Sequence, residues 1–268
     1  MVLFLTIIIR YFSSKQKSTI CCDRAKDNKT LLTDIKFSAP YKIMQPFIKD
    51  NKTKVILLSA SAGIMEGDRQ EFHFEVKNGA NLEFNSQSYD KIHKMYTGCA
   101  KRKVYVHVEK NANFCFNPQP TIPFKDSAFE NTMKIYLDDE TASFQMSEIF
   151  SCGRYMRNEC FAYRHYYNYV EIYRGDKLIY RDNTKYIPKL FSMSSLGMYE
   201  GYTHLANIFI SKSNNTNIFL EEVNKLLNEC DAVDGGITEL INGDFSIRIF
   251  AFRAQILEDL TKKILSLC

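Results

Sequence analysis

Two alternating stretches of the chain place histidines and carboxylates on what would be one face of a β-sheet. In "EFHFEV" Glu71, His73 and Glu75 alternate with apolar residues, and in "KVYVHVE" His107 and Glu109 do the same. Successive side chains of a strand point to opposite faces. If the strands are neighbours, this face suits a divalent ion, with His73 and His107 as weak candidate ligands. The competing interpretation is a solvated sheet face without a metal.

A second set of polar residues interrupts an otherwise apolar strand. In "SEIFSCGRYMRNECF" Glu148 lies in a strand-like run, and Arg154, Arg157 and Glu159 follow it. A buried acid is costly unless it is paired, so we expect Arg154 or Arg157 to pair with Glu148 and fix a turn. The alternative is that these polar groups line an internal water-filled path.

Other reactive residue types give weaker patterns. "GIMEGD" approaches a phosphate loop, but Asp68 follows Gly67 where that loop needs Lys, so we predict a turn that presents a carboxylate. His93, His165 and His204 lie in separate segments and are expected to be core or surface residues rather than ligands. No Cys has a His partner that can be read from the sequence.

Composition narrows the class of protein. The 268 residues are 45% hydrophobic and 25% charged, as in an ordinary globular protein. Basic and acidic residues are interspersed and the net charge is +4, so nucleic-acid binding is not expected. The eight cysteines form no C-x-x-C pair, which favours free thiols in a reducing cytoplasm. The apolar run 2–9 is far short of the ~20 residues that span a bilayer, so no membrane association is expected.

Alternation with a period of two residues dominates from 53 to 180 and predicts strands without intervening helices. The predicted strands are 54–60, 71–77, 81–87, 103–110, 112–117, 132–137, 143–150 and 167–174. Helical periodicity appears only near 219–230 and 254–267, with a strand at 245–252 between them. The pattern predicts a mainly β fold of stacked or coiled sheets with a small C-terminal α+β region.

The segment "NPQPTIPF" (117–124) holds three of the six prolines and no charge. Proline fixes φ and removes a backbone donor, so we predict that this segment does not run in the middle of a sheet ladder. A rigid corner between two strands is the expected structure, and it could also lie at a protein interface.

Four stretches occur in an order and spacing that resemble the UreD/UreH family of urease accessory proteins, in particular the UreH type of ε-proteobacteria. They are "SAGIMEGD", "NSQSYDKIHK", "NPQPTIPF" and "SEIFSCGRYMRNE". One departure is Ala62, which stands where the family has the first glycine of a pair. The residues that match the family's structural motifs are Gly63, Gly67, Pro118, Pro120, Pro123, Phe124, Gly153 and Arg154.

The resemblance implies a β-helix-like stack of strands in a single domain over 18–268, whereas residues 1–17 are an extension of uncertain status. It implies a protein that is not an enzyme but a nickel-insertion chaperone of the cytoplasm. Such proteins bind apo-urease and, directly, a UreF-like partner, which recruits a UreG-like GTPase. The implied cargo is Ni²⁺ in transit through a water-filled tunnel, with no tightly bound cofactor.

A conduit for Ni²⁺ should hold the ion loosely, because a cage of His and Cys would trap it. We therefore hypothesise that Asp68, Glu148 and Glu159 line or gate a path, together with the polar residues Ser86, Gln87 and Ser88. The alternative function is a metal-dependent enzyme that uses the Glu71/His73/Glu75 and His107/Glu109 face.

Overall fold

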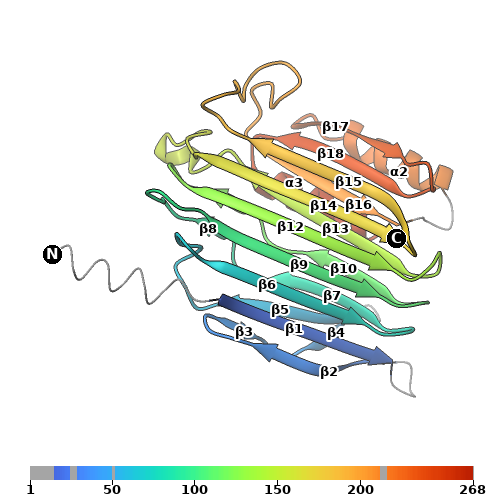
Figure 1. The fold of residues 1–268 in the computed structure, drawn as a ribbon. Helices are drawn as coiled ribbons and strands as arrows, with labels where there is room; N and C mark the ends of the chain where they lie inside the picture. The colour runs from blue at the N-terminus through green and yellow to red at the C-terminus, as the bar shows by residue number, and fades with distance from the viewer. Residues whose placement is uncertain (1–14, 25–28, 50–51, 212–215, 268) are drawn as a thin grey trace.

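The computed structural model describes residues 15–24, 29–49, 52–211 and 216–267, and it consists mainly of two β-sheets (Figure 1). The first sheet has seven strands in the order β15-β14-β12-β9-β6-β1-β2. The central neighbours β1, β6, β9, β12 and β14 pair in parallel, whereas β2 and β15 pair antiparallel at the edges. The strand bounds are β1 Lys15–Arg24, β2 Thr30–Phe37, β6 Arg69–Val76, β9 Ala100–Val108, β12 Ala128–Leu137, β14 His165–Arg174 and β15 Lys177–Tyr186.

The second sheet follows the order β17-β18-β16-β13-β10-β7-β5-β3, and β4, β8 and β11 pair beside this path. Its neighbours β5, β7, β10 and β13 pair in parallel, and the remaining main-path pairs are antiparallel. The strand bounds are β3 Tyr41–Ile43, β4 Phe47–Lys49, β5 Lys52–Ser59, β7 Asn81–Ser86, β8 Asp90–Ile92, β10 Asn113–Asn117, β11 Thr121–Pro123, β13 Ser143–Ser151, β16 His204–Ile210, β17 Val233–Glu239 and β18 Phe245–Ala251.

The chain crosses from one sheet to the other at almost every step between β5 and β14. It runs β5, β6, β7, β9, β10, β12, β13, β14, with the members of this series alternating between the second and the first sheet. Each coil therefore lays one strand on each sheet, parallel to the strand of the previous coil. This winding confirms the expected mainly β, β-helix-like stack of strands.

Apolar side chains from both sheets fill the space between them. One large cluster includes Phe74, Val106 and Ile135 from the first sheet and Phe84 and Phe114 from the second. A second cluster lies around the two described helices, α2 (Thr216–Asn228) and α3 (Ala254–Leu265), which pack on strands of the C-terminal half of the second sheet. A single 3-10 turn, η1 (Tyr155–Arg157), interrupts the connection from β13 to β14.

Every strand expected between residues 53 and 180 is present, with bounds that differ from the expected ones by a few residues at most. Both helices and the strand between them are also confirmed. The strands β1 to β4, the short β8 and β11, and the later β15, β16 and β17 had not been predicted. Of the expected N-terminal extension, residues 1–14 lie outside the described residues, whereas Lys15 already belongs to β1. Neither described helix is long and apolar enough to cross a membrane.

Candidate functional site

The two His/Glu strands predicted to share a face are indeed neighbours in the first sheet. The register pairs His73 with Tyr105 and Glu75 with His107, so the two imidazoles are not opposite each other. His73 Nε2 lies 2.8 Å from Glu71 Oε1. The ring nitrogens of His107 lie 3.0 Å from Glu75 Oε2 and 2.8 Å from Asp138 Oδ1.

Glu109 on the same face pairs with Lys77 at 2.8 Å. Each of these groups therefore already has a protein partner. Within the described residues, this face does not bring three His, Cys, Asp or Glu ligand atoms together at one point. The geometry gives little support to the alternative of a metal-dependent enzyme at these residues.

The interior of the first sheet carries a row of polar side chains at a single register level. Each of five neighbouring strands contributes one residue, and the strand registers align these residues across the sheet. We call this set the interior polar row: Gln16, Gln70, Arg102, Asn131 and Asn168. Four of the five are at most 6% exposed, and the side chain of Arg102 is 13% exposed.

The interior polar row separates two apolar clusters. The inward-facing residues that precede the row along the strands belong to one cluster, and those that follow it belong to the other. Phe72, Val104 and Met133 belong to the large central cluster. Ala100 and Phe129 belong to a cluster near the starts of the same strands. A polar layer across an apolar interior is costly unless its groups bond to one another.

Hydrogen bonds link neighbouring members of the row. Arg102 Nε donates to Gln70 Oε1 at 2.8 Å, and its Nη1 lies 2.7 Å from Asp90 Oδ2. Asn131 donates to Asn168 at 2.7 Å, and Asn168 Nδ2 donates to Glu148 Oε2 at 2.8 Å. Glu148 comes from the opposite sheet, so the row reaches across the interior at this end.

Glu148 is therefore paired with an amide, and not with an arginine. The expected partnership with Arg154 or Arg157 is wrong, because Arg154 bonds to Glu159 beyond the end of β13. Burial raises the pKa of Glu148 to about 7, only partly opposed by the bond from Asn168. A neutral amide stabilises the carboxylate less than a guanidinium would, so burial dominates.

Three small cavities follow the row and share lining residues. The first, of about 50 Å³, is lined by Gly63, Gln70, Ser88 and Asp90 among others. The next, of about 40 Å³, adds Ser86, Arg102 and Pro118. The third, of about 20 Å³, has Asp90, Arg102 and Pro118 in common with the second and reaches Asn131 and Glu148. Each has room for at least one water molecule, which needs roughly 10–15 Å³.

The motif stretches singled out in the sequence stack on one another at one corner of the coil. Ile64 forms a parallel bridge with Ile92, and β8 pairs in parallel with β11, which sets Ile92 beside Pro123. The ring of His93 lies 4.8 Å from that of Phe124, and the Arg154 guanidinium carbon lies 4.0 Å above the Phe124 ring. We call this stack the motif corner.

Two glycines of the motif corner are required by close backbone contacts. A Cβ at Gly63, whose φ is +145°, would lie 2.3 Å from the Lys91 carbonyl oxygen. A Cβ at Gly153, whose φ is +132°, would lie 2.5 Å from the Glu159 carbonyl oxygen. Only a residue without a Cβ allows successive turns to approach this closely.

The proline segment differs from its prediction. Thr121–Pro123 form the short strand β11, and Thr121 pairs with Asp90 on one side and with Phe150 on the other. The segment therefore does enter a sheet ladder. Thr121 is not a proline and keeps its backbone N–H, whereas Pro118 and Pro123 lie near the ends, where no central ladder bond is needed.

The remaining predicted path residues lie apart from the cavities. Glu159 accepts from Arg154 Nε at 2.7 Å and from the Lys125 N–H at 3.0 Å, and the bond from Arg154 holds the pKa of Glu159 below its usual value. Asp68 is 3% exposed and accepts from the Met65 N–H at 2.9 Å, and burial raises its pKa. The side chain of Gln87 is exposed.

Sequence reasoning missed all five members of the interior polar row. The signal was nevertheless present, because each member precedes an inward residue of its strand by two positions, as in Gln70-Glu71-Phe72 and Asn131-Thr132-Met133. Alternation places such a residue on the inward face. A polar residue at an inward position near the start of several successive strands could therefore have been recognised as a layer.

Comparison with known proteins identifies the same family that the four motif stretches resemble. A family model described as UreD urease accessory protein matches residues 18–268. A urease accessory protein UreH from Helicobacter pylori strain P12 is 34% identical over 239 residues, which are 89% of this chain and 89% of the relative. A urease accessory protein UreD from Acetivibrio thermocellus is 32% identical over 243 residues, 90% of this chain and 92% of the relative. The chain thus belongs to the UreD family of urease accessory proteins.

Proposed function

We propose that this urease accessory protein is a scaffold for nickel insertion into apo-urease and that Ni²⁺ passes along the interior polar row. The observation that carries the proposal is the series of cavities between Gly63 and Glu148, lined by hydroxyl, amide and carboxyl groups. No function in catalysis is part of the proposal. The ion is cargo, so its binding should be weak and reversible.

The chemistry of the lining favours transfer over storage. The described residues that line the three cavities include no His or Cys, the ligands that would hold nickel tightly. Oxygen ligands are available from Ser86, Ser88 and Glu148. The charge of Arg102 opposes a cation, but Asp90 lies 2.7 Å from it and offsets that charge.

Glu148 suits a step in which an ion arrives and leaves. With a pKa of about 7, its carboxyl group is largely protonated in slightly acidic solution and is readily ionised near neutral pH. A divalent cation favours the ionised form, so it would displace the proton on arrival, and the proton would return after the ion leaves. The buried site then avoids an uncompensated charge when it is empty.

Asp68 and Glu159 have a different part in the proposal. Both accept backbone hydrogen bonds in turns near the motif corner, which forms one wall of the first cavity through Gly63 and Lys91. We assign them the positioning of that wall, and we assign Glu148 direct contact with the ion. Ser86 shapes the middle of the path, because its Oγ accepts the Gln119 N–H at 2.9 Å.

The proposal includes partner proteins. The chain binds apo-urease and a UreF-like protein directly, and a UreG-like GTPase joins through the UreF-like protein and delivers Ni²⁺. These partners come from the family resemblance of the four motifs. The cytoplasm is the proposed location, in agreement with the scattered free thiols.

A co-expression experiment tests the proposal. The tagged chain is expressed with a urease operon that lacks its own UreD, and urease activity, urease nickel content and proteins retained on the tag are measured. Restored activity with UreF and UreG on the tag is expected. A stable chain that retains neither partner and restores no activity would contradict the bridging function.

Two variants then separate the path from the scaffold. Glu148→Ala should lower the nickel content of urease while the tag still retains the partners, because only the interior changes. Glu109→Ala is the matched control, since Glu109 lies on the outer face and pairs with Lys77. If Glu148→Ala leaves nickel content at the level of the control, the path does not run past Glu148.

A further inference from the structure

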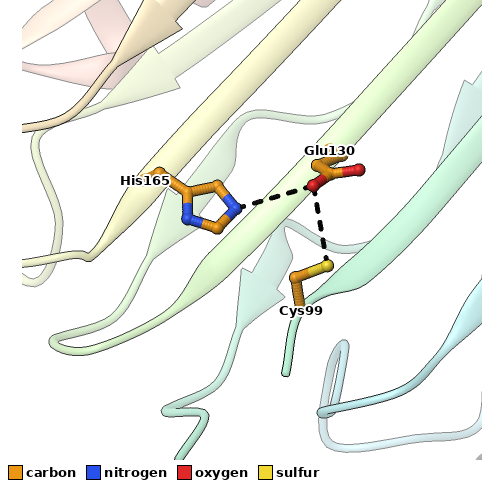
Figure 2. A group of neighbouring side chains, drawn as sticks. All are labelled: Cys99, Glu130 and His165. Carbon is orange, nitrogen blue, oxygen red and sulfur yellow. Dashed lines mark hydrogen bonds and ion pairs between the residues drawn. The ribbon is translucent and has the colours of Figure 1, made fainter. Parts of the chain in front are cut away.

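Three side chains with possible metal-ligand atoms converge on the outer face of the first sheet, away from the interior polar row. Cys99 precedes β9, Glu130 lies in β12, and His165 begins β14 (Figure 2). Their thiol, carboxylate and imidazole atoms all lie within 4.8 Å of one another. This is the single group of this kind within the described residues. The sequence analysis had predicted that His165 is a core or surface residue rather than a ligand.

The sheet register explains why they meet. His165 pairs with Ala128, and Phe129 pairs with Ala100, so Cys99 continues the same row on the other side of Ala128. Alanine is the central member of this row, and its single methyl group leaves space between the thiol and the imidazole. The carboxyl group of Glu130 comes two positions along the same strand, and Figure 2 shows it directed toward the thiol and the imidazole.

The distances are close to those of a tetrahedral site. Cys99 Sγ lies 3.7 Å from Glu130 Oε1, and His165 Nε2 lies 3.9 Å from the same oxygen. With ordinary Zn–S, Zn–N and Zn–O bond lengths, tetrahedral ligand atoms are about 3.4–3.6 Å apart. Both separations from Glu130 Oε1 exceed that spacing by about half an ångström or less, and the thiol and imidazole atoms lie within 4.8 Å of each other. An octahedral ion would require about 3 Å, a larger rearrangement.

Neighbouring groups orient Glu130 and leave a nitrogen of His165 available. Lys101 Nζ lies 2.6 Å from Glu130 Oε2, which leaves Oε1 directed at the other two residues. His165 Nε2 is buried and has no hydrogen-bond partner, so the nitrogen that faces Glu130 is unused. Burial lowers the pKa of His165 and raises the pKa of the Cys99 thiol.

We propose that Cys99, Glu130 and His165 form a three-ligand site for a divalent ion that prefers tetrahedral coordination, with Zn²⁺ as the fitting ion and water in the fourth position. The thiol releases its proton to solvent as the sulfur–metal bond forms, because thiolate is the ligand. This site is independent of the proposed nickel path and does not require it. Lys101 and Arg164 are the nearby cations, and the two anionic ligands offset them.

Metal titration of the full chain tests the site. Protein freed of metal with a chelator is titrated with ZnCl₂ by calorimetry and with CoCl₂ by absorption, because Co²⁺ bound to thiolate gives a sulfur-to-metal charge-transfer band. One ion per chain and a thiolate band are expected. Titration in two buffers of different ionisation enthalpy should report release of about one proton per ion. Parallel titration with NiCl₂ should show weaker binding than ZnCl₂.

Variants assign the binding to these residues. Cys99→Ser should abolish the cobalt thiolate band, and Glu130→Gln and His165→Ala should each weaken Zn²⁺ binding at least tenfold. Cys160→Ser and His73→Ala are matched controls, since Cys160 is an exposed free thiol elsewhere and His73 lies in the other histidine face. A wild-type chain without a thiolate band, or a band that survives Cys99→Ser and disappears in Cys160→Ser, would overturn the proposal.

Discussion

Replacing Glu148 by glutamine should stabilise the protein, and the gain should depend on pH. Glutamine has nearly the same shape, and its carbonyl oxygen can still accept the 2.8 Å bond from Asn168. It carries no charge, so it avoids the cost of ionising a carboxyl group inside the coil. Burial is the main reason that the pKa of Glu148 rises from 4.5 to about 7 in the folded chain.

The size of the effect follows from that displacement. In the unfolded chain Glu148 ionises near its ordinary pKa of 4.5, whereas in the folded chain it keeps its proton up to about 7. Between these values the folded state binds more protons than the unfolded state, so stability falls as pH rises. The full displacement corresponds to roughly 3 kcal/mol. Most of this loss, about 2–3 kcal/mol, falls between about pH 5 and about pH 8.

Urea unfolding of the wild type and of Glu148→Gln, each at about pH 5 and at about pH 8, measures this difference in the free energy of unfolding. The variant should have a small advantage at the lower pH and an advantage of roughly 3 kcal/mol at the higher pH. Glu109→Gln is the control, because the bond from Lys77 lowers the pKa of Glu109 and any stability change with pH falls at acidic pH instead. Wild type and Glu148→Gln curves that stay parallel across this pH range would refute the reasoning.

Two further predictions concern stability. Arg174→Met should destabilise the protein by about 3–5 kcal/mol. The reason is that Asp244, which is fully buried and 2.8 Å from Arg174 Nη2, would lose a charge partner. Urea unfolding measures the loss, and a change below about 1 kcal/mol would contradict the prediction. Gly153→Ala should destabilise by more than 1 kcal/mol, since its Cβ would lie 2.5 Å from the Glu159 carbonyl oxygen. The control Gly236→Ala has open space around the new Cβ and should change the midpoint little.

Local pattern was sufficient for the strands that form the coil. Alternation of polar and apolar residues, as in Glu71-Phe72-His73-Phe74, reports that one face of a strand is buried, whichever strands are its neighbours. The same dependence on alternation explains why β2 and β4 were missed. These strands carry exposed apolar residues such as Phe37 and Phe47, so their alternation between buried and exposed positions is weak.

The site was only partly accessible to this reasoning. Glu148 could be singled out because an acid in an apolar strand needs compensation. Its partner could not, because Asn168 lies 20 residues further on and in the opposite sheet. Arg154 was the expected partner on proximity in sequence, but the turn after β13 directs it to Phe124 and Glu159.

The sequence by itself determined that this chain forms a mainly β fold, because strand periodicity is local, and it identified the four motifs that mark its family. Only the tertiary structure decided which polar residues meet. Parallel winding sets residues about 30 positions apart side by side, which creates the interior polar row and also gathers Cys99, Glu130 and His165. Such contacts depend on the register between coils, and register is fixed by packing of the whole interior rather than by any one segment.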